Sequence, residues 1–201
     1  MLILVRHGES TGNAARLLAG RVEVPLTERG REQARAVGAS LHGVTRVIAS
    51  PLGRARDTAE ALDLGLPVEI DDRWVEVDYG EYDGRPLGDV PPATWAEWRA
   101  DPHFRPPGGE TMAEVGTRVR AACEELFAVD GEGARGEGDV VVVSHVSPIK
   151  AATCWALGLP DEGAWRLYLA TASVTRIAQG PGGIALHTFN DTPWSKGPPV
   201  R

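Results

Sequence analysis

Three short apolar runs, each followed directly by polar residues, constrain most strongly what this chain can fold into. The runs cover residues 2–5, 45–49 and 140–143. Runs rich in aliphatic and β-branched side chains are typical of strands buried on both faces of a sheet. Segments with helical periodicity separate the runs, and such alternation is typical of a mostly parallel sheet covered by helices on both faces. The pattern therefore predicts an α/β fold.

The polar residues that follow these runs carry the chemistry that the sequence offers. They are, run by run, Arg6 and His7, then Ser50 with Arg54 one helical turn further on, then Ser144 and His145. Parallel strands share one carboxyl edge, where ligands bind in α/β folds, so we expect these groups to converge if the strands are neighbours. Two arginines and two histidines suit a phosphate group, because a guanidinium offers phosphate a planar, bidentate fork.

Motifs that the sequence lacks limit the kinds of reaction to be expected at this site. The chain has no GxxxxGK loop of the P-loop type, and neither paired aspartates nor an HxxxH spacing suited to a metal. Phosphoryl transfer would then use a side-chain nucleophile, electrostatic stabilisation by the arginines, and a positioned acid that protonates the leaving oxygen. A neutral histidine can be that nucleophile. We therefore expect neither a metal nor another cofactor.

Composition limits the partners. The net charge of −7 argues against general nucleic-acid binding, which needs a basic face, but leaves room for a small phosphate ester in a local cationic pocket. No apolar run is long enough to span a membrane. The first strand leaves no room for a signal peptide, and Cys123 and Cys154 have the pattern of small buried thiols, so a cytoplasmic location is expected. The oligomeric state, monomer or homodimer, stays open.

Several local patterns give further expectations. Helices are expected from Ser10 or Thr11 to Leu18 and from a Ser50-Pro51 start, and short strands over residues 165–169, 173–177 and 183–189. Residues 71–109 are irregular except for a short helix over 94–100, and their aromatic residues either cover the sheet or form a substrate lid. These aromatic residues are Trp74, Tyr79, Tyr82, Trp95 and Trp98. A tail over residues 192–201 is expected to fray.

Six segments in this order resemble the histidine phosphatase superfamily, also called the phosphoglycerate mutase-like family. They read VRHGES-TGN (5–13), Gly20 with PLTERG (25–30), SPLGRARDTAE (50–60), WVEVDYGEYDG (74–84), PGGET (107–111) and VVSHVSPIK (142–150). The resemblance covers nearly the whole chain. It implies a phosphoglycerate mutase-like fold, a three-layer α/β/α sandwich with a mostly parallel central sheet, as a single domain over residues 1–191.

The resemblance also implies roles for individual residues. His7 would be the nucleophile that forms a phosphohistidine, and Glu76 the acid for the leaving group and then the base for water. The phosphoryl group would be bound by Arg6, Arg54 and His145, with Asn13 in contact and with Ser10 and Gly20 contributing less directly. The residue pattern alone does not single out Glu76 among the many carboxylates. Val146 stands where the family often has glycine, which changes the pocket wall.

The first interpretation is a metal-independent phosphomonoester hydrolase that acts on a small phosphorylated metabolite. The SHVSPIK segment is similar to the branch of α-ribazole phosphatases and acid phosphatase domains. A cofactor-dependent mutase is the alternative, but the stretch between Glu76 and Glu110 is short and its arginines, Arg85, Arg99 and Arg105, are scattered. A phosphate-ester binding module without catalysis is a further alternative, although the full set of implied catalytic residues is present.

Overall fold

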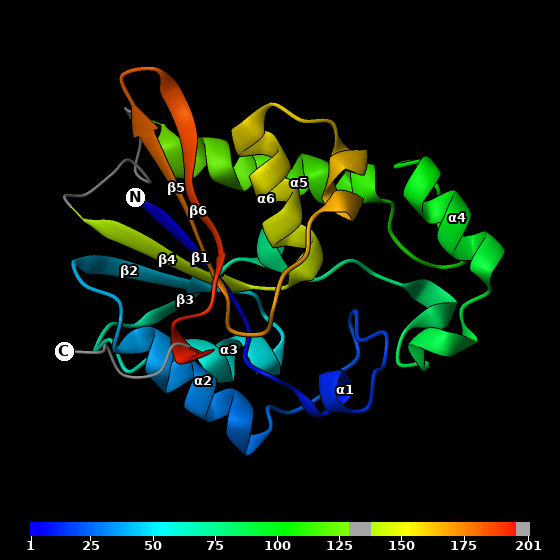
Figure 1. Cartoon of the computed structure of the whole chain (residues 1–201), viewed down its shortest axis with the longest axis horizontal. Helices are drawn as coiled ribbons and strands as arrows, with labels where there is room; N and C mark the ends of the chain where they lie inside the picture. Colours follow the sequence, from blue (N-terminus) through cyan, green and yellow to red (C-terminus); the bar gives the residue numbers. More distant parts are fainter. Residues whose placement is uncertain (129–137, 196–201) are drawn as a thin grey trace.

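One six-stranded sheet organises the chain. The computed structural model describes residues 1–128 and 138–195, and its strands lie in the order β3-β2-β4-β1-β5-β6 (Figure 1). The strands are β1 (Leu2–Arg6), β2 (Val44–Ala49), β3 (Val68–Ile70), β4 (Asp139–Ser144), β5 (Val174–Gly180) and β6 (Gly183–Asp191). The first four are parallel to one another, whereas β5 pairs antiparallel with β1 and β6. The mostly parallel sheet expected from the sequence is therefore confirmed.

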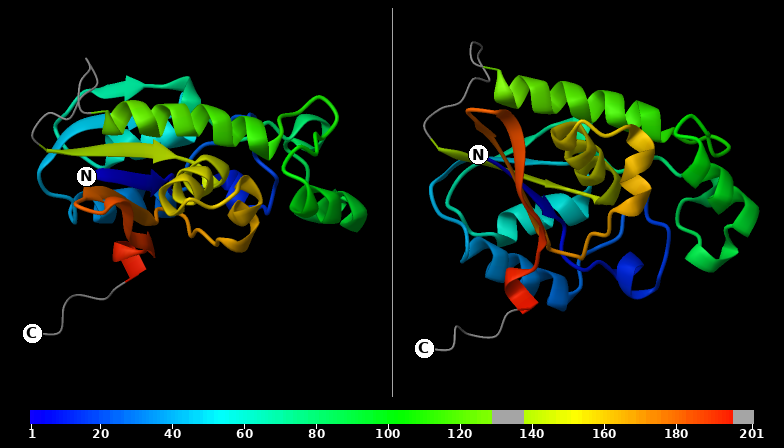
Figure 2. Two further views of the ribbon diagram at one scale, coloured as in Figure 1. Left: turned by 90° about the horizontal axis from the view of Figure 1, so that it is seen from above. Right: turned by 45° about the horizontal axis from the view of Figure 1, so that its top comes forward.

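Helices cover both faces of this sheet. Helices α2 (Glu28–Gly38) and α3 (Gly53–Ala61) lie on one face, and α5 (Met112–Phe127) and α6 (Val146–Leu157) lie on the other (Figures 1 and 2). Each helix pair encloses its own apolar core against the sheet. The three-layer α/β/α architecture is confirmed, and it explains why the central strands lack alternating polar residues.

Strand β1 shows how one apolar run serves both cores. Leu2 and Leu4 pack in the core under α5 and α6, while Ile3 and Val5 pack in the core under α2 and α3. Successive side chains of a strand point to opposite faces, so four consecutive aliphatic residues are needed where both faces are covered. The next two residues of the chain, Arg6 and His7, leave the apolar interior at the carboxyl end.

The register of the three central strands brings their ends level. In the β1–β4 pair Arg6 lies opposite Ser144, and in the β2–β4 pair Ala49 lies opposite Val143. The hydrogen bonds continue one residue further, from His7 N to the Ser144 carbonyl oxygen (2.9 Å) and from Ser50 N to that of Val143 (3.0 Å). Because β4 lies between β1 and β2, the polar residues after the three strands meet at one edge.

The stretch between β3 and α5 is built mainly from aromatic packing. It contains the 3₁₀-helices Asp72–Trp74, Gly80–Tyr82 and Leu87–Asp89 and the helix α4 (Pro92–Ala100), so the expected short helix is confirmed. Trp74 joins the main core, while the other rings form a separate aromatic cluster with Leu18 and Val90, namely Tyr79, Tyr82, Trp95, Trp98, Phe104 and Trp165. Trp98 lies at its centre, 5.4 Å from the Tyr79 ring and 5.5 Å from that of Trp95. This cluster holds α4, which projects from the side of the molecule (Figure 2).

One expected strand is absent, and one expected helix begins later than predicted. Residues 165–169 form no strand; the 3₁₀-helix Asp161–Arg166 ends there, and Trp165 packs in the aromatic cluster. Helix α3 begins at Gly53, with Leu52 as its N-cap, instead of at Pro51. The Ser50 hydroxyl lies 2.7 Å from His145 Nε2 and accepts a hydrogen bond from Leu52 N at 3.4 Å.

Two helix boundaries also differ. Helix α1 is only Thr11–Ala14, because the chain turns at Arg16, whose φ is 56°, before Leu18 is reached. Helix α6 begins at Val146, although Ser147 followed by Pro148 is a pattern typical of a helix start.

The described part of the expected tail is packed. Residues Pro193–Ser195 form a 3₁₀-helix, and the Trp194 indole N–H donates to the Thr171 carbonyl oxygen at 3.1 Å. The Arg29 guanidinium lies over the Trp194 ring, 5.9 Å from its centre. The rest of that tail, 196–201, lies outside the described residues. Within the described ranges, none of the helices has the length and apolar character that crossing a bilayer requires.

Candidate active site

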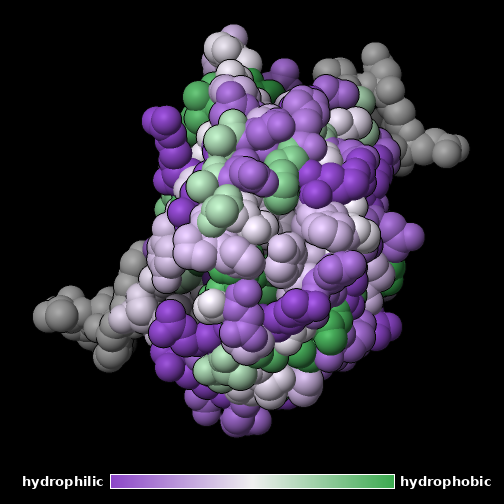
Figure 3. Space-filling view, turned by 90° about the vertical axis from the view of Figure 1, so that its right-hand side faces the viewer, coloured by the Kyte–Doolittle hydropathy of each residue, from purple (hydrophilic) through white to green (hydrophobic). Residues whose placement is uncertain are grey.

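A cavity of about 210 Å³ lies at the carboxyl edge of the sheet. Six of the eight residues that the sequence singled out line it, namely Arg6, His7, Ser10, Asn13, Arg54 and Glu76. The other two lie directly behind: the His145 ring centre is 5.1 Å from that of His7, and the Gly20 carbonyl accepts a hydrogen bond from Arg54. On the side of the molecule from which α4 projects, hydrophilic residues predominate and hydrophobic ones lie scattered in small groups (Figure 3).

His7 is held with one ring nitrogen free to react. Its Nδ1 lies 2.7 Å from the Gly8 carbonyl oxygen, which can only accept, so Nδ1 carries the proton and the neutral ring has its lone pair on Nε2. Burial holds the pKa of His7 well below its usual value, and the neighbouring Arg6 and Arg54 lower this pKa further. The ring is therefore neutral at neutral pH, as a nucleophile requires.

The two arginines supply the positive charge. Arg54 is 1% exposed, and its guanidinium donates to the carbonyl oxygens of Ala19 (3.1 Å), Gly20 (2.6 Å) and Val22 (3.0 Å). Arg6 donates to the Leu169 carbonyl oxygen at 2.7 Å. Burial lowers the pKa of both side chains, yet both remain charged because arginine titrates far above neutrality. In each, the buried Nε–H has no hydrogen-bond partner among the described residues.

His145 occupies the N-cap position of α6, where its ring faces Ser50 instead of capping the helix. Its Nε2 lies 2.7 Å from the Ser50 hydroxyl, and its Nδ1 is buried without a partner in the described part of the chain. Burial lowers the pKa of His145 well below its usual value, so this ring too is neutral. A Ser50 hydroxyl that donates to Nε2 leaves the ring proton on Nδ1, the unpartnered atom.

Glu76 is fixed by backbone groups from a distant part of the chain. Its carboxylate, 4% exposed, accepts from Val146 N at 3.1 Å and Ser147 N at 3.1 Å, and from Val77 N at 2.9 Å. The first N–H groups of a helix lack partners within the helix, so Glu76 satisfies two of them at the start of α6. The Arg118 guanidinium donates to the Glu76 carbonyl oxygen at 3.4 Å and holds the same segment.

Asn13 and Ser10 cap helix α1 at the rim of the cavity. The Asn13 side-chain oxygen accepts from Ser10 N and the Ser10 hydroxyl, both at 3.0 Å, and Asn13 N donates to that hydroxyl at 3.2 Å. Since the amide oxygen is used in the cap, the amide NH₂ of Asn13 is the group left for a ligand. The Ser10 hydroxyl is already engaged in the cap.

Two glycines allow close approaches that shape the site. A Cβ on Gly20 would lie 2.6 Å from the Val77 carbonyl oxygen, and a Cβ on Gly8 would collide with the Gly30 carbonyl oxygen. Gly8 thus permits contact with the start of α2.

The aromatic residues of the stretch 71–109 line little of the cavity, whereas a substrate lid would cover it. Of the five that the sequence singled out, only Tyr79 lines it, together with Leu17, Leu18 and Leu87. Trp95 and Trp98 pack within the aromatic cluster and do not line the cavity. Sequence reasoning missed the leucines, because their place depends on chain segments that meet only in the fold.

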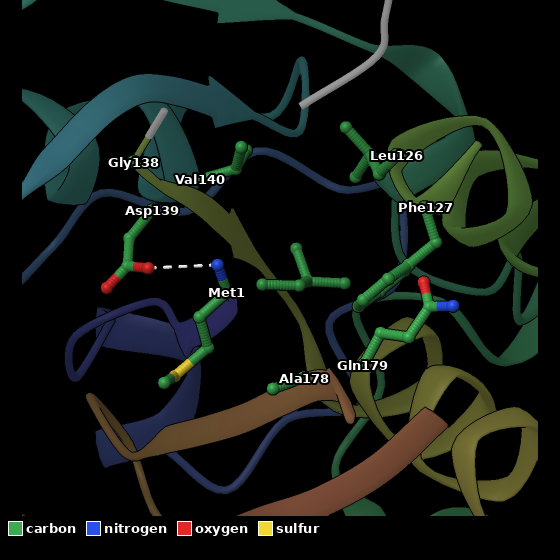
Figure 4. Close-up of a pocket in the computed structure, with 9 residues that line it drawn as sticks. Met1, Leu126, Phe127, Gly138, Asp139, Val140, Ala178 and Gln179 are labelled. Atoms are coloured by element: carbon green, nitrogen blue, oxygen red, sulfur yellow. Dashed lines mark ion pairs between the residues drawn. The ribbon is translucent and has the colours of Figure 1, made fainter. Parts of the chain in front are cut away.

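A second depression lies at the opposite, amino edge of the sheet. It has a volume of about 270 Å³ and is lined by residues such as Leu126, Phe127 and Val140 (Figure 4). The terminal amino group of Met1 pairs there with the Asp139 carboxylate at 2.9 Å. None of the candidate catalytic side chains lies in it. Over the described ranges, no group of three His, Cys, Asp or Glu side chains is placed to hold a metal ion.

The fold and the site agree with a family match over nearly the whole chain. Residues 2–192 match the model of the histidine phosphatase superfamily, branch 1. The chain therefore belongs to this superfamily, as the sequence motifs indicate.

Curated relatives include both longer proteins and mutases. The bifunctional protein Rv2228c of Mycobacterium tuberculosis is 37% identical over 201 residues, which are 95% of this chain and 54% of that protein. The chain thus spans about half the length of this relative. A protein of Erwinia tasmaniensis named "Probable phosphoglycerate mutase GpmB" is 37% identical over 183 residues, 87% of this chain and 82% of its own.

Solved structures give the same fold with phosphatase names. The mycobacterial glucosyl-3-phosphoglycerate phosphatase Rv2419c with VO3 aligns with a TM-score of 0.84 and 31% identity, over 94% of this chain and 98% of its own. A protein of Escherichia coli described as a "putative alpha-ribazole-5'-P phosphatase" aligns with a TM-score of 0.81 and 29% identity, over 95% and 96% of the two chains.

Proposed function

We propose that this protein hydrolyses small phosphate monoesters through a phosphohistidine on His7, without a metal ion. One observation carries the proposal: near the neutral imidazole of His7, three buried guanidinium and ring nitrogens have no hydrogen-bond partner among the described residues. These groups are Arg6 Nε, Arg54 Nε and, in the tautomer argued above, His145 Nδ1. Buried donors that lack partners are costly, so a bound phosphoryl group that accepts from all three would be favoured.

In the first step His7 Nε2 attacks the phosphorus atom, and the bond from phosphorus to the ester oxygen breaks. Glu76, in its protonated form, gives its proton to the departing oxygen, so an alcohol leaves. Arg6 and Arg54 stabilise the charge on the non-bridging oxygens in the transition state. Because His7 starts neutral, its lone pair is available without prior deprotonation.

In the second step water attacks the phosphohistidine. The Glu76 carboxylate takes a proton from the water molecule while the bond from phosphorus to Nε2 breaks, which releases inorganic phosphate and restores the neutral ring. The backbone N–H groups of Val146 and Ser147 hold this carboxylate in one place through both steps. A fixed position favours proton transfer in both directions.

The contacts of Arg85, Arg99 and Arg105 favour hydrolysis over a mutase reaction. A mutase that retains a bisphosphorylated intermediate needs cations for a second phosphate. Arg85 lies over the Tyr82 ring, Arg99 over the Trp95 ring, and Arg105 pairs with Glu114. None of the three lines the cavity.

The decisive experiment is phosphate release from a panel of phosphomonoesters in excess chelator. The panel contains sugar phosphates, phosphoglycerates, nucleotides, α-ribazole phosphate and an aryl phosphate. We expect release from at least one of them, and acid-labile, base-stable phosphate on the protein in a rapid quench. Isomer conversion of phosphoglycerate without release would instead indicate the mutase.

A matched pair of variants tests the covalent step. His7→Ala should abolish turnover while circular dichroism shows an intact fold, and His42→Ala, which removes an exposed histidine, should behave as the unchanged protein. A His7→Ala variant that keeps most of its activity would refute the phosphohistidine. Binding of inorganic phosphate without turnover of any ester would favour the non-catalytic module.

A further inference from the structure

A smaller chamber adjoins the catalytic cavity. Its volume is about 50 Å³, and it is lined by Tyr79, Val146, Ser147, Lys150 and Trp165, with Met112 and Ala164 behind. Tyr79 and Val146 line both spaces, so the two meet at these residues. The chamber therefore lies next to Glu76, whose partner N–H groups belong to Val146 and Ser147.

Lys150 is the charged group of this chamber. It is half-buried on α6, one helical turn after Val146 and hence on the same helix face. Burial lowers the pKa of its ammonium group, whereas the charge of Glu76 raises it. No hydrogen bond or ion pair joins Lys150 to any other described residue. An ammonium group that lines a cavity and pairs with no carboxylate of the described residues is available to an anion that enters this cavity.

Trp165 adds a second donor. Its indole N–H is buried and has no hydrogen-bond partner within the described residues, although the ring lines the chamber. A buried indole N–H usually finds a partner. The chamber thus combines one cation and one neutral donor, neither of which the proposed chemistry uses.

We propose that this chamber binds a carboxylate of the substrate's leaving group, with Lys150 as the residue that confers this specificity. The inference rests on the proposed phosphatase function and assigns its substrates to short organic acids that carry a phosphate ester. The carboxylate accepts from the Lys150 ammonium and from the Trp165 indole.

Size, charge and spacing suit a carboxylate. About 10–15 Å³ of this kind of space holds one water molecule, so a chamber of about 50 Å³ admits a carboxylate group. One cation beside one neutral donor matches the single charge of a carboxylate better than the two charges of a phosphate. Four residues along a helix advance about 6 Å from Val146 to Lys150. A leaving group of two or three carbons, at about 1.5 Å per bond, covers this separation once the ends of both side chains reach toward it.

The test compares two esters that differ only in the carboxylate. 3-Phosphoglycerate and glycerol 3-phosphate share a three-carbon skeleton, and only the first carries a carboxylate. For Lys150→Met we expect kcat/KM on 3-phosphoglycerate to fall at least tenfold, mainly through KM, with less than a twofold change on glycerol 3-phosphate. Trp165→Phe, which keeps a ring but removes the N–H, should show a smaller effect with the same selectivity.

Arg166→Met is the control. It removes one positive charge from an exposed side chain next to Trp165, so it tests whether long-range attraction alone explains the result. We expect Arg166→Met either to leave kcat/KM unchanged or to change it equally for both esters. Product inhibition by inorganic phosphate should be the same in Lys150→Met as in the unchanged protein.

Other outcomes would overturn the inference. A Lys150→Met variant that loses activity equally on both esters, with a shifted pH profile, would show that Lys150 acts through Glu76. If the unchanged protein hydrolyses other phosphomonoesters but neither ester, calorimetry compares the pair as ligands, and equal affinities refute the chamber while the phosphatase function stands. Failure to hydrolyse any ester would refute the proposed function itself, and the same calorimetric comparison would then decide the chamber independently.

Discussion

Asp83 and Arg54 both hydrogen-bond the backbone of one loop, residues 20–22, Asp83 through its N–H groups and Arg54 through its carbonyl oxygens. The Asp83 carboxylate accepts from the backbone N–H groups of Gly20 (2.7 Å), Arg21 (2.7 Å) and Val22 (2.9 Å). The carbonyl oxygens of Gly20 and Val22 accept in turn from the Arg54 guanidinium. Asp83 therefore positions Arg54 through the loop and without a direct hydrogen bond between the two side chains.

Removal of this carboxylate should loosen the phosphate site. We expect Asp83→Ala to lower kcat/KM about tenfold, which corresponds to about 1.4 kcal/mol, because the loop carbonyls no longer hold the guanidinium in one orientation. Inhibition by inorganic phosphate should weaken in parallel. Steady-state kinetics on the best ester of the panel measures both effects.

A double-mutant cycle separates positioning from general loss of stability. If Asp83 acts through Arg54, Asp83→Ala should have little further effect in an Arg54→Ala background. Asp89→Ala, which removes an exposed carboxylate from the same region, is the matched control and should leave kinetics unchanged. If the losses in kcat/KM caused by Asp83→Ala and Arg54→Ala add fully, Asp83 does not act through Arg54.

The sequence predicts the sheet and its layers well because the property that defines a buried strand lies within the strand's own few residues. A strand buried on both faces must be aliphatic throughout, and the runs at residues 2–5 and 140–143 have this property. Residues 165–169 mislead because Trp165 and Leu169 alternate with polar residues as in a strand. Trp165 instead packs in the aromatic cluster and Leu169 in the main core, through contacts with distant segments that no local pattern contains.

The residues of the site also divide into those that the strand pattern predicts and those that only the folded structure brings into place. Arg6 ends β1, and His7 and His145 directly follow β1 and β4, so the topology alone predicts that they meet. Glu76 follows no strand of the central three, and N–H groups some 70 residues later in the chain place it. Only the family resemblance could indicate it. The chamber at Lys150 combines α6 with three other segments, and for this reason the sequence reveals neither the cavity nor its donors.

The role proposed for Glu76 predicts a dependence on the leaving group. A general acid matters most when a poor leaving group departs, so Glu76→Gln should slow hydrolysis of alkyl esters about 10²–10⁴-fold and aryl esters much less. The ratio of the two rates in one variant cancels any structural cost of the new amide. Equal losses on p-nitrophenyl phosphate and an alkyl phosphate would refute Glu76 as the acid.

Ser50 should set the tautomer of His145. With the hydroxyl donating to Nε2, we expect nitrogen NMR of the unchanged protein to show His145 protonated on Nδ1. Ser50→Ala removes this preference and should weaken inhibition by inorganic phosphate about tenfold, since one donor to the anion is no longer fixed. Ser144→Ala is the control, because that buried hydroxyl donates to the Trp74 carbonyl oxygen at 2.6 Å. A ring protonated on Nε2 in the unchanged protein would contradict the assignment.

The two buried histidines also predict how stability depends on pH. In the folded protein the pKa values of His7 and His145 lie well below 6.5, whereas in the unfolded chain they return to about 6.5. Below pH 6.5 the unfolded state therefore binds more protons than the folded state. The free energy of unfolding should fall as the pH is lowered from 7, by up to about 1.4 kcal/mol per pH unit for each ring, until the folded-state pKa is reached.

Urea unfolding between pH 7.5 and 5.5 measures this slope. His145→Asn should flatten it by the share of one ring, because the substituted amide does not titrate, and His42→Asn at an exposed position should leave it unchanged. A slope in the unchanged protein as shallow as in His145→Asn would mean that the folded state protonates this ring readily. The neutral histidine pair on which the phosphohistidine chemistry depends would then be lost at mildly acidic pH, and activity should fall together with it.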